Sequence, residues 1–396
     1  MMNGVKLGQP GVFSPLGNTP EQLLRGILAA EAGAMASSDA FHLNRATVVG
    51  QAAALSQPLP ESLAHWDCRN NRMLANCCEQ IDGQVQEAVN RYGRDRLAVI
   101  LGTSTSGIEA YENTLWADDD RAPEARSYDY RKQEMGTCAL FVAERFNLPG
   151  IAYTISTACS SAAKALAAAA RLLQQGKVDA VICGGSDSLC RLTINGFDAL
   201  ESYSKGQGAP LTQGRDGINI GEASVLFVMT REAGGVRLCG AGESSDAHHV
   251  SAPHPQGHGA EAAMRAALAM ARISPQAISY INLHGTGTPL NDAMECDAVF
   301  RIFGDRVPVS STKGMTGHTL GAAGALEAAM CWALLSDSNS ELKLPPQRLW
   351  GEWDSALAPV SLAQESHRLP RSGAYLLSNS FAFGGSNIAL IFSCER

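Results

Sequence analysis

Residues 151–176, IAYTISTACSSAAKALAAAARLLQQG, contain the elements that decide the fold. The apolar run Ile151–Ser156 has the length and composition of a buried strand, and a short turn of small residues follows it. The Ala-rich stretch Ala162–Gln175 then predicts a helix, which Gly176 ends. Because this helix has almost no polar face, it must be buried on most sides. With a second apolar run at Val178–Cys183, the segment predicts an α/β protein.

The length and composition of the chain restrict its class. A chain of 396 residues, 45% hydrophobic and 18% charged, suits two domains or one large α/β unit. Its net charge of −8 argues against general binding of nucleic acid or anionic membranes, both of which require a basic surface. Its 11 cysteines form no C-x-x-C pair, no signal peptide is visible, and no apolar run reaches the roughly 18 residues of a membrane span. We therefore expect a cytoplasmic protein that neither crosses a membrane nor binds nucleic acid.

The second half of the chain repeats the plan of the first. The run Ile278–Leu283 leads into a Gly/Thr turn, as the run Leu97–Leu101 does in the first half. Two pairs of features recur at nearly one offset along the chain, namely Cys159 with His318 and Gly221 with Gly385. We therefore predict two similar α-β-α halves, residues 1–233 and 234–396.

Three reactive side chains lie at the ends of predicted strands or the starts of predicted helices. Cys159 follows the strand of residues 151–156, where the N-terminus of the next helix favours an anion and would lower the pKa of the thiol. His284 directly follows a predicted strand, and His318 precedes a predicted helix. Strand ends are where α/β sheets place active sites. Each residue alone is more often an inert buried thiol or a structural histidine, so it is their joint placement that favours a nucleophile with two partners.

Five motifs, in order along the chain, resemble the elongating β-ketoacyl-ACP synthases, the two-histidine ketosynthases. The similarity extends from about Gly102 to the C-terminus, and the motifs are TACSS (157–161), RDG…GE (215–222), HGTGT (284–288), KGMTGH (313–318) and NSFAFGGSN (379–387). The resemblance implies the thiolase-like fold, in which two duplicated α-β-α halves stack as five layers. It also implies an acyltransferase that elongates a fatty acid, polyene or polyketide chain.

The chemistry that this resemblance implies is a two-step carbon–carbon condensation. Cys159 would accept an acyl chain from the phosphopantetheine arm of an acyl carrier protein, and a malonyl thioester would then lose CO₂ and attack the acyl-enzyme. His284 and His318 would donate hydrogen bonds to the carbonyl of the malonyl thioester. Lys313 would hold the local charge balance, and Glu327 would serve as the partner of His318. The resemblance implies no metal ion and no bound cofactor.

The same resemblance assigns a gate and the substrate contacts. The backbone N–H groups of Cys159 and Phe383 would form the oxyanion hole, and Phe383 would swing between the acyl pocket and the entry channel. Its neighbours are Gly384 and Ala382, and family members usually carry Gly at the latter position, so the extra methyl group restricts the backbone. The other assigned positions are Thr286 and Thr288 for the pantetheine arm, Ile108 for the end of the acyl pocket and Asp246 in a second mobile loop.

The partners that the resemblance implies are an acyl carrier protein and a second subunit. A carrier protein is acidic and requires a basic docking surface, for which Arg69 and Arg72 are the candidates. The family also implies a dimer, either with an identical chain or with a related chain-length factor.

Two regions carry no role in this reading. The acidic segment Trp116–Asp120 is interpreted as a solvated loop. A histidine cluster near Asp246 allows a metal-binding interpretation, which we disfavour because no cysteine or carboxylate stands at ligand spacing. Its members are His248, His249, His254 and His258.

Two other functions remain as alternatives. A non-catalytic subunit like a chain-length factor would share the fold but lack the nucleophile, whereas the cysteine and both histidines are present here. A thiolase would use a second cysteine near the C-terminus, but the segment Asn379–Asn387 has none and Cys394 ends a strand. Residues 1–75 depart from the family pattern, which favours a pathway-specific ketosynthase, such as an aryl polyene type, over a housekeeping enzyme.

Overall fold

The structure is a computed structural model that describes residues 4–30, 34–115 and 129–395. The segment Trp116–Asp120, predicted as a loop, lies outside the described residues. The helices are α1 (Pro20–Ala29), α2 (Arg69–Tyr92), α3 (Ile108–Leu115), α4 (Thr137–Arg145), α5 (Ser161–Gln174), α6 (Arg191–Ala199), α7 (His258–Ala271), α8 (Pro289–Phe303), α9 (Lys313–Thr316) and α10 (Ala323–Leu335). The strands are β1 (Val5–Leu7), β2 (Gly11–Phe13), β3 (Met35–Ser38), β4 (Thr47–Gly50), β5 (Leu97–Gly102), β6 (Ala152–Ile155), β7 (Ala180–Asp187), β8 (Ala223–Thr230), β9 (Gly235–Ser245), β10 (Ile278–Asn282), β11 (Pro308–Ser310), β12 (Ser361–Leu362), β13 (Tyr375–Ala382) and β14 (Ser386–Glu395). Within these ranges, every helix is too short or too polar to cross a lipid bilayer.

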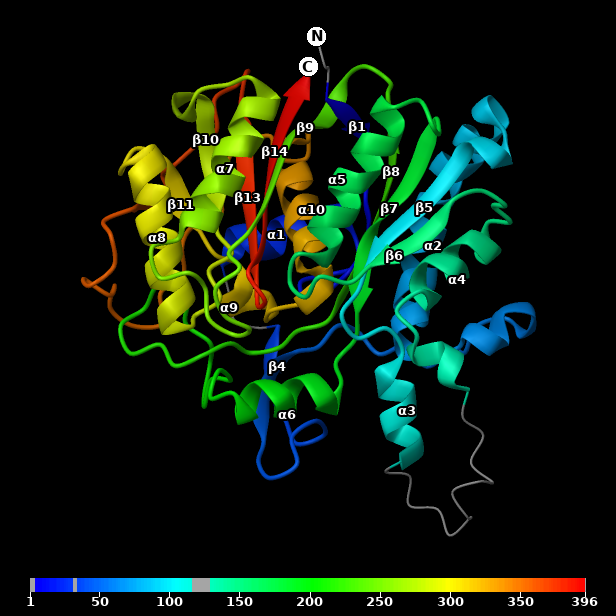
Figure 1. The fold of residues 1–396 in the computed structure, drawn as a ribbon, viewed down its shortest axis with the longest axis horizontal. Coiled ribbons are helices and arrows are strands. Elements are labelled where there is room, and N and C mark those ends of the chain that lie inside the picture. The colour runs from blue at the N-terminus through cyan, green and yellow to red at the C-terminus, as the bar shows by residue number, and fades with distance from the viewer. Residues whose placement is uncertain (1–3, 31–33, 116–128, 396) are drawn as a thin grey trace.

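The strands form one long mixed sheet and one small hairpin (Figure 1). The order in the long sheet is β12-β11-β10-β13-β14-β9-β1-β8-β7-β5-β6, with β2 paired to β8. Strand β1 pairs antiparallel with both β8 and β9 and so joins the two parts of the sheet. Strands β3 and β4 form the separate hairpin.

The pairing pattern is the same in the two parts of the sheet. In the first part, β5 is parallel to β6 and β7, and β7 is antiparallel to β8. In the second part, β10 is parallel to β11 and β13, and β13 is antiparallel to β14. This repetition confirms the predicted pair of similar halves. Because β8 ends at Thr230 and β9 begins at Gly235, we propose a domain boundary between residues 233 and 234.

The helices and the two parts of the sheet form five layers (Figure 1). Helices α7 and α8 cover the outer face of the second part, and α2 and α4 cover the outer face of the first. Helices α5 and α10 lie between them, where α5 contacts β5, β7 and β14 and α10 contacts β8 and β13. The predicted five-layer α/β architecture is therefore confirmed.

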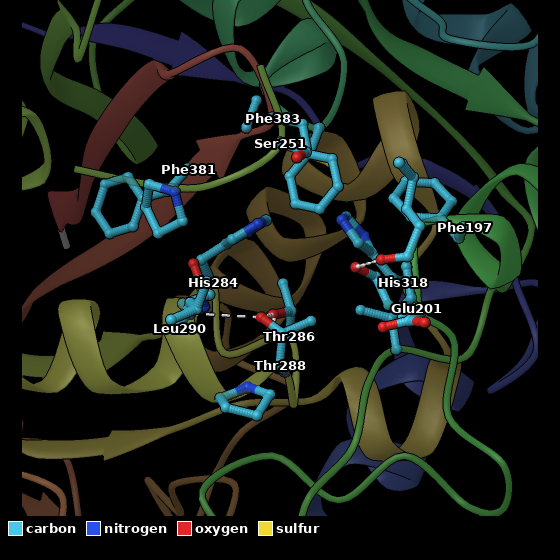
Figure 2. A pocket seen from close by; sticks show the side chains of 18 of the residues that line it. Phe197, Glu201, Ser251, His284, Thr286, Thr288, Leu290, His318, Phe381 and Phe383 are labelled. Atoms are coloured by element: carbon cyan, nitrogen blue, oxygen red, sulfur yellow. Dashed lines mark hydrogen bonds between the residues drawn. The ribbon is translucent and has the colours of Figure 1, made fainter. Parts of the chain in front are cut away.

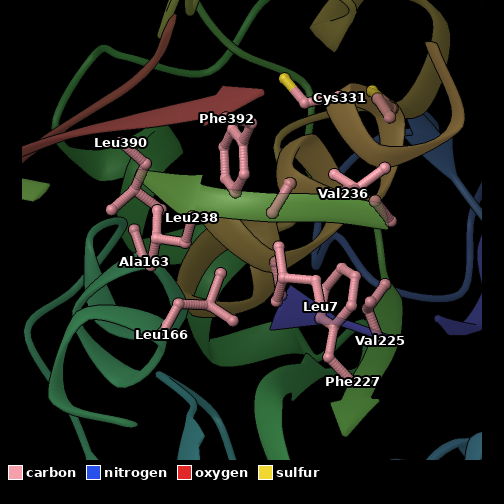
Figure 3. Packing of buried hydrophobic residues seen from close by; sticks show 14 of the residues in the cluster. Leu7, Ala163, Leu166, Val225, Phe227, Val236, Leu238, Cys331, Leu390 and Phe392 are labelled. Atoms are coloured by element: carbon pink, nitrogen blue, oxygen red, sulfur yellow. The ribbon is translucent and has the colours of Figure 1, made fainter. Parts of the chain in front are cut away.

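The central layer depends on small side chains. The helix predicted over Ala162–Gln175 is α5, and most of its alanines are buried, as its lack of a polar face predicts. Helix α10 is buried along nearly its whole length. Larger apolar side chains from β1, β8, β9 and β14 fill the space around the two helices, and Figure 3 shows Leu7, Phe227 and Leu238 among them. Small residues at the helix contact let two buried helices approach each other closely.

We predict that Gly324→Ala lowers the free energy of unfolding by about 1–3 kcal/mol, because overpacking of a filled core has costs of this size. A Cβ at Gly324 of α10 would lie 2.6 Å from the Cβ of Ala163 in α5. Gly83→Ala in α2 is the matched control, because a Cβ there meets no atom within 4 Å. The control should instead gain about 0.5–1 kcal/mol from helix propensity. Urea denaturation measures both, and equal effects of the two substitutions would contradict the close packing of α5 on α10.

Candidate active site

Cys159 occupies a tight turn between β6 and α5. The hydroxyl of Ser161 accepts from the N–H of Thr157 at 2.9 Å and donates to the carbonyl of Ala158 at 2.6 Å. Ala158 has a positive φ of 51°, which residues with a side chain rarely adopt. This turn places the thiol of Cys159 in the wall of a cavity, with only 5% of the residue exposed.

Two histidines, His284 and His318, line the same cavity as Cys159, whose volume is about 300 Å³; Figure 2 shows their rings at the cavity. His284 follows β10, and His318 follows α9. The Sγ of Cys159 and one nitrogen of each ring all lie within 4.8 Å of one another. The two rings meet edge to face, with their centroids 5.2 Å apart, and both residues are buried. The structure therefore brings together three residues that lie far apart in the sequence.

Burial controls the charge of all three groups. Burial raises the pKa of the Cys159 thiol to about 11, although the charge of Lys313 and the backbone N–H groups of Phe383 and of Cys159 itself act to lower it. The sequence-based prediction of a lowered thiol pKa is therefore wrong for the free protein. The physical reason is that α5 begins at Ser161, beyond Cys159, and the effect of its dipole is smaller than the cost of removing the thiolate from water.

The two imidazoles are neutral in this environment. Burial, with the nearby charge of Lys313, holds the pKa of His284 and that of His318 well below the usual range. The Nδ1 of His318 accepts a hydrogen bond from the backbone N–H of Leu320 at 3.3 Å. The proton of this neutral ring must therefore be on Nε2, which has no partner among the described residues. His318 is thus a hydrogen-bond donor toward the cavity.

Lys313 and Glu327 form a buried ion pair beside these rings. The Nζ of Lys313 donates to Oε1 of Glu327, and each side chain is only 3% exposed. The prediction that Glu327 partners His318 is wrong, because its carboxylate contacts Lys313 instead. Burial raises the pKa of Glu327, and the ammonium of Lys313 opposes that shift. Neither residue is the solvated surface group that its type alone would suggest.

Other predicted residues also line the cavity, and they are Thr286, Thr288, Asp246, Ala382 and Phe383. The hydroxyls of the two threonines lie 3.0 Å apart. The Oδ1 of Asp246 accepts from Nδ2 of Asn387 at 2.7 Å, and the N–H of Gly384 donates to the carbonyl of Val250 at 2.8 Å. The first bond ties the loop after β9 to the start of β14, and the second ties it to the loop that carries Phe383.

Ile108 does not line this cavity. It lies at the start of α3 and lines a separate groove of about 510 Å³, together with Leu115 and Leu192. The expectation that Ile108 ends the acyl pocket therefore requires the groove to connect with the cavity of Cys159, and α6 separates the two in this structure.

Two sets of polar residues lie away from the cavity. Arg69 pairs with the buried carboxylate of Glu222, and Arg72 pairs with Asp67 at 2.6 Å. Both arginines are therefore paired with carboxylates of the same chain, and their role in docking a carrier protein stays a prediction. In the histidine cluster, the ring of His254 lies 5.0 Å from that of His248 and 4.7 Å from that of His258.

Comparison with known proteins decides the family. Residues 11–234 match the family described as "Beta-ketoacyl synthase, N-terminal domain", and residues 236–343 match "Beta-ketoacyl synthase, C-terminal domain". This chain belongs to the β-ketoacyl synthase family.

This β-ketoacyl synthase is similar to relatives along most of its length. It is 32% identical over 324 residues to 3-oxoacyl-[acyl-carrier-protein] synthase 2 of Staphylococcus aureus, an alignment that covers 77% of this chain and 78% of that protein. It is 30% identical to 3-oxoacyl-[acyl-carrier-protein] synthase 1 of Haemophilus influenzae, with 96% and 97% covered. A solved structure titled "Ketosynthase (ApeO) in Complex with its Chain Length Factor (ApeC) from Xenorhabdus doucetiae" superposes with a TM-score of 0.93 and 43% identity, with 99% and 98% covered. The resemblance read from the motifs is confirmed, and the chain is an acyltransferase.

A metal ion is a poor fit to the β-ketoacyl synthase site. Among the described residues, Cys159, His284 and His318 are the one group of histidine, cysteine or acidic side chains close enough to hold a metal. A metal on Nε2 of His318 would require the proton on Nδ1, where it would face the N–H of Leu320. The charge of Lys313, which lowers the pKa of both histidines, would also oppose a cation. The surroundings suit donation by neutral rings better than metal ligation.

Two buried acids in the β-ketoacyl synthase site were missed by the sequence reasoning. Glu295 of α8 accepts from the N–H groups of His284 and Gly285 at 2.8 and 2.7 Å, and burial raises its pKa to about 7. Asp187, at the end of β7, accepts from the N–H of Thr105 and from that of Gly321, three residues after His318. Both acids hold the backbone that carries a histidine. The sequence did contain a signal for both residues: each is an acidic residue in a strand or helix segment that otherwise reads as buried.

We predict that alkylation of Cys159 by iodoacetamide accelerates from neutral pH up to the thiol pKa of about 11, because only the thiolate reacts. Mass analysis of the peptide that contains Cys159 measures the rate and separates it from the other cysteines. Cys159→Ser is the control for the assignment. A rate that levels off near neutral pH would contradict the raised thiol pKa.

Proposed function

We propose that this β-ketoacyl synthase catalyses a two-step decarboxylative condensation in which Cys159 carries the acyl chain. The observation that carries the proposal is the meeting of the Cys159 sulfur with two neutral imidazoles inside one cavity, with their reactive atoms within 4.8 Å. This set provides a nucleophile and two donors for a developing oxyanion, which are the groups that thioester condensation requires.

In the first step, the sulfur of Cys159 attacks the carbonyl of an acyl-pantetheine thioester. The backbone N–H groups of Cys159 and Phe383, which act to lower the pKa of this thiol, would stabilise the tetrahedral oxyanion. The bond from the acyl carbon to the pantetheine sulfur then breaks, and the proton lost by the Cys159 thiol ends on the departing pantetheine thiol. Because the thiol pKa is high, the charge of Lys313 and the two N–H groups are needed to stabilise the thiolate as it forms.

In the second step, a malonyl thioester binds opposite the acyl-cysteine and loses CO₂. The Nε2–H of His318 would donate to the thioester oxygen as it gains negative charge, and His284 would supply the second hydrogen bond. Because both ring pKa values are low, the rings stay neutral and stabilise the enolate oxygen without giving up a proton. The enolate carbon then attacks the acyl-cysteine carbonyl, and the Cys159 thiolate leaves.

Substrate access would follow the polar wall of the cavity. The paired hydroxyls of Thr286 and Thr288 would bind the amides of a phosphopantetheine arm. Phe383, between Ala382 and Gly384, would act as the gate, with Asp246 on the loop that touches it. A bound cofactor has no part in this proposal, since the acyl groups arrive on the carrier protein.

A second subunit would cover the exposed edge of the long sheet. Strand β6 is the last strand at that edge; its Tyr153 is 38% exposed, and Ile151 before it and Leu140 of α4 are 42% and 47% exposed. An exposed apolar edge of this kind favours pairing with another chain. We propose a dimer with an identical or related subunit, and the likeness to a ketosynthase solved with a chain length factor supports the second form.

The same likeness supports a pathway-specific role, such as elongation of an aryl polyene chain, over a housekeeping role. All 11 cysteines are free, which suits a reducing compartment and supports a cytoplasmic location.

The alternative of a non-catalytic subunit loses support because the nucleophile and both histidines meet in one cavity. The thiolase alternative loses support because Cys394 lines a different pocket, with Leu369 and Arg371.

We predict that incubation with an acyl-loaded carrier protein adds one acyl mass to Cys159, and that Cys159→Ala abolishes the adduct. Intact-mass measurement followed by peptide mapping gives the result. A chelator should leave the adduct unchanged, because the cavity disfavours a metal. An unmodified wild-type protein would contradict the catalytic proposal and favour the non-catalytic subunit.

We predict that His318→Ala slows condensation at least about tenfold more than it slows acyl transfer to Cys159, because a lost oxyanion donor costs about 10²–10³ in rate only where the oxyanion forms. Acyl transfer is measured by mass and condensation by release of CO₂ from malonyl carrier protein. Equal losses in the two steps would contradict the role assigned to His318.

A further inference from the structure

Helix α6 forms the wall between two cavities. Phe197 lines the cavity of Cys159, while the two preceding residues, Asn195 and Gly196, line the apolar groove that contains Ile108. The cavity measures about 300 Å³ and the groove about 510 Å³. A displacement of this one helix would therefore change the space available next to Cys159.

The loop between β3 and β4 holds α6 by four polar contacts. Asp198 of α6 accepts from Nη2 of Arg45 at 2.6 Å and pairs with Nε2 of His42 at 3.0 Å. Asn195 accepts from the N–H of Leu43 at 3.1 Å and donates to the carbonyl of Phe41 at 2.9 Å. We call this set of contacts the hairpin clasp. Arg45, followed by His42, lowers the pKa of Asp198, so the carboxylate is charged and engaged with both.

The root of the hairpin is locked against the loop of His318. Gly50, at the end of β4, donates to the carbonyl of Ile220 at 2.9 Å, and the N–H of Gly221 donates to the carbonyl of His318 at 3.0 Å. A Cβ at either Gly50 or Gly221 would overlap the carbonyl oxygen of Thr316. This close packing at the root supports the hairpin whose tip carries the four contacts to α6.

Phe197 is the side chain through which α6 meets the gate. Its ring lies 5.4 Å from the ring of Phe383, and Figure 2 shows both rings at the cavity. Phe197 stands on the helix that separates the cavity from the groove, so an acyl chain that extends from the cavity toward the groove would have to displace its ring. We propose that the hairpin clasp is a positioning device that holds Phe197 against Phe383 and thereby limits the length of the acyl chain at Cys159. This inference rests on the proposed function, because it concerns the chain that Cys159 carries.

The test compares how short and long chains reach Cys159. N-butyl and N-dodecyl iodoacetamide are the probes, and the rate of modification of the Cys159 peptide is measured by mass for each. We expect Asp198→Asn to raise the long-to-short rate ratio by about threefold, a change in the range of a lost surface ion pair. Asp198→Glu, which keeps the negative charge, should show the same long-to-short rate ratio as the wild type.

Asp179→Asn is the matched control. Asp179 also pairs with two basic groups, Arg96 and Arg231, but it lies at the end of the sheet away from α6. This variant should leave the ratio unchanged. A wild-type ratio in Asp198→Asn, or an equal fall in both rates, would overturn the proposal, because a role in stability alone would affect both probes alike. Alkylation requires only a thiol in a cavity, so this test stands whether or not a carrier protein loads Cys159.

Discussion

Burial of the Cys159 thiol beside two imidazoles is the constraint on which this structure depends. Removing Cys159 from water makes the thiolate costly, so the site must supply compensating groups, which are two backbone N–H donors and the charge of Lys313. That charge is itself buried and requires the carboxylate of Glu327 beside it. The same burial keeps His284 and His318 neutral, which makes them donors in place of acids. The buried polar groups of the site therefore depend on one another, because each charged form needs a neighbouring group to offset the cost of its burial.

The duplicated fold explains why these groups meet. Cys159 precedes α5 and His318 precedes α10, and these two helices pack together in the central layer as equivalent elements of the two halves. Small residues such as Ala163 and Gly324 permit this approach, and larger ones at the helix contact would separate the two reactive groups. The packing of α5 against α10 in the core therefore sets how close Cys159 and His318 lie in the site.

In the proposed function, one set of elements around the site holds the residues that carry out the chemistry and another forms the wall that selects the substrate. Buried acids hold the backbone next to the two histidines. Asp187 accepts a hydrogen bond from the N–H of Gly321, near His318, and Glu295 accepts one from the N–H of His284. The wall of the cavity, by contrast, depends on α6, a short helix held at one end by Glu112 of α3 and near the other by Asp198. A family can retain the first arrangement and vary the second, which suits an enzyme whose reaction is shared and whose acyl chain is not.

The sequence by itself determined the α/β class, the duplication and the family, and it predicted the three residues that meet in the cavity, because strand and helix periodicity and short motifs are local properties of the chain. Only the tertiary structure decided that the Cys159 thiol is neutral, that Glu327 contacts Lys313, that Ile108 lies behind α6 and that Arg69 is already paired. These properties depend on burial and on contacts between residues far apart in the chain. No local pattern contains them, since the same side chain has a different charge and partner in water and in a packed interior.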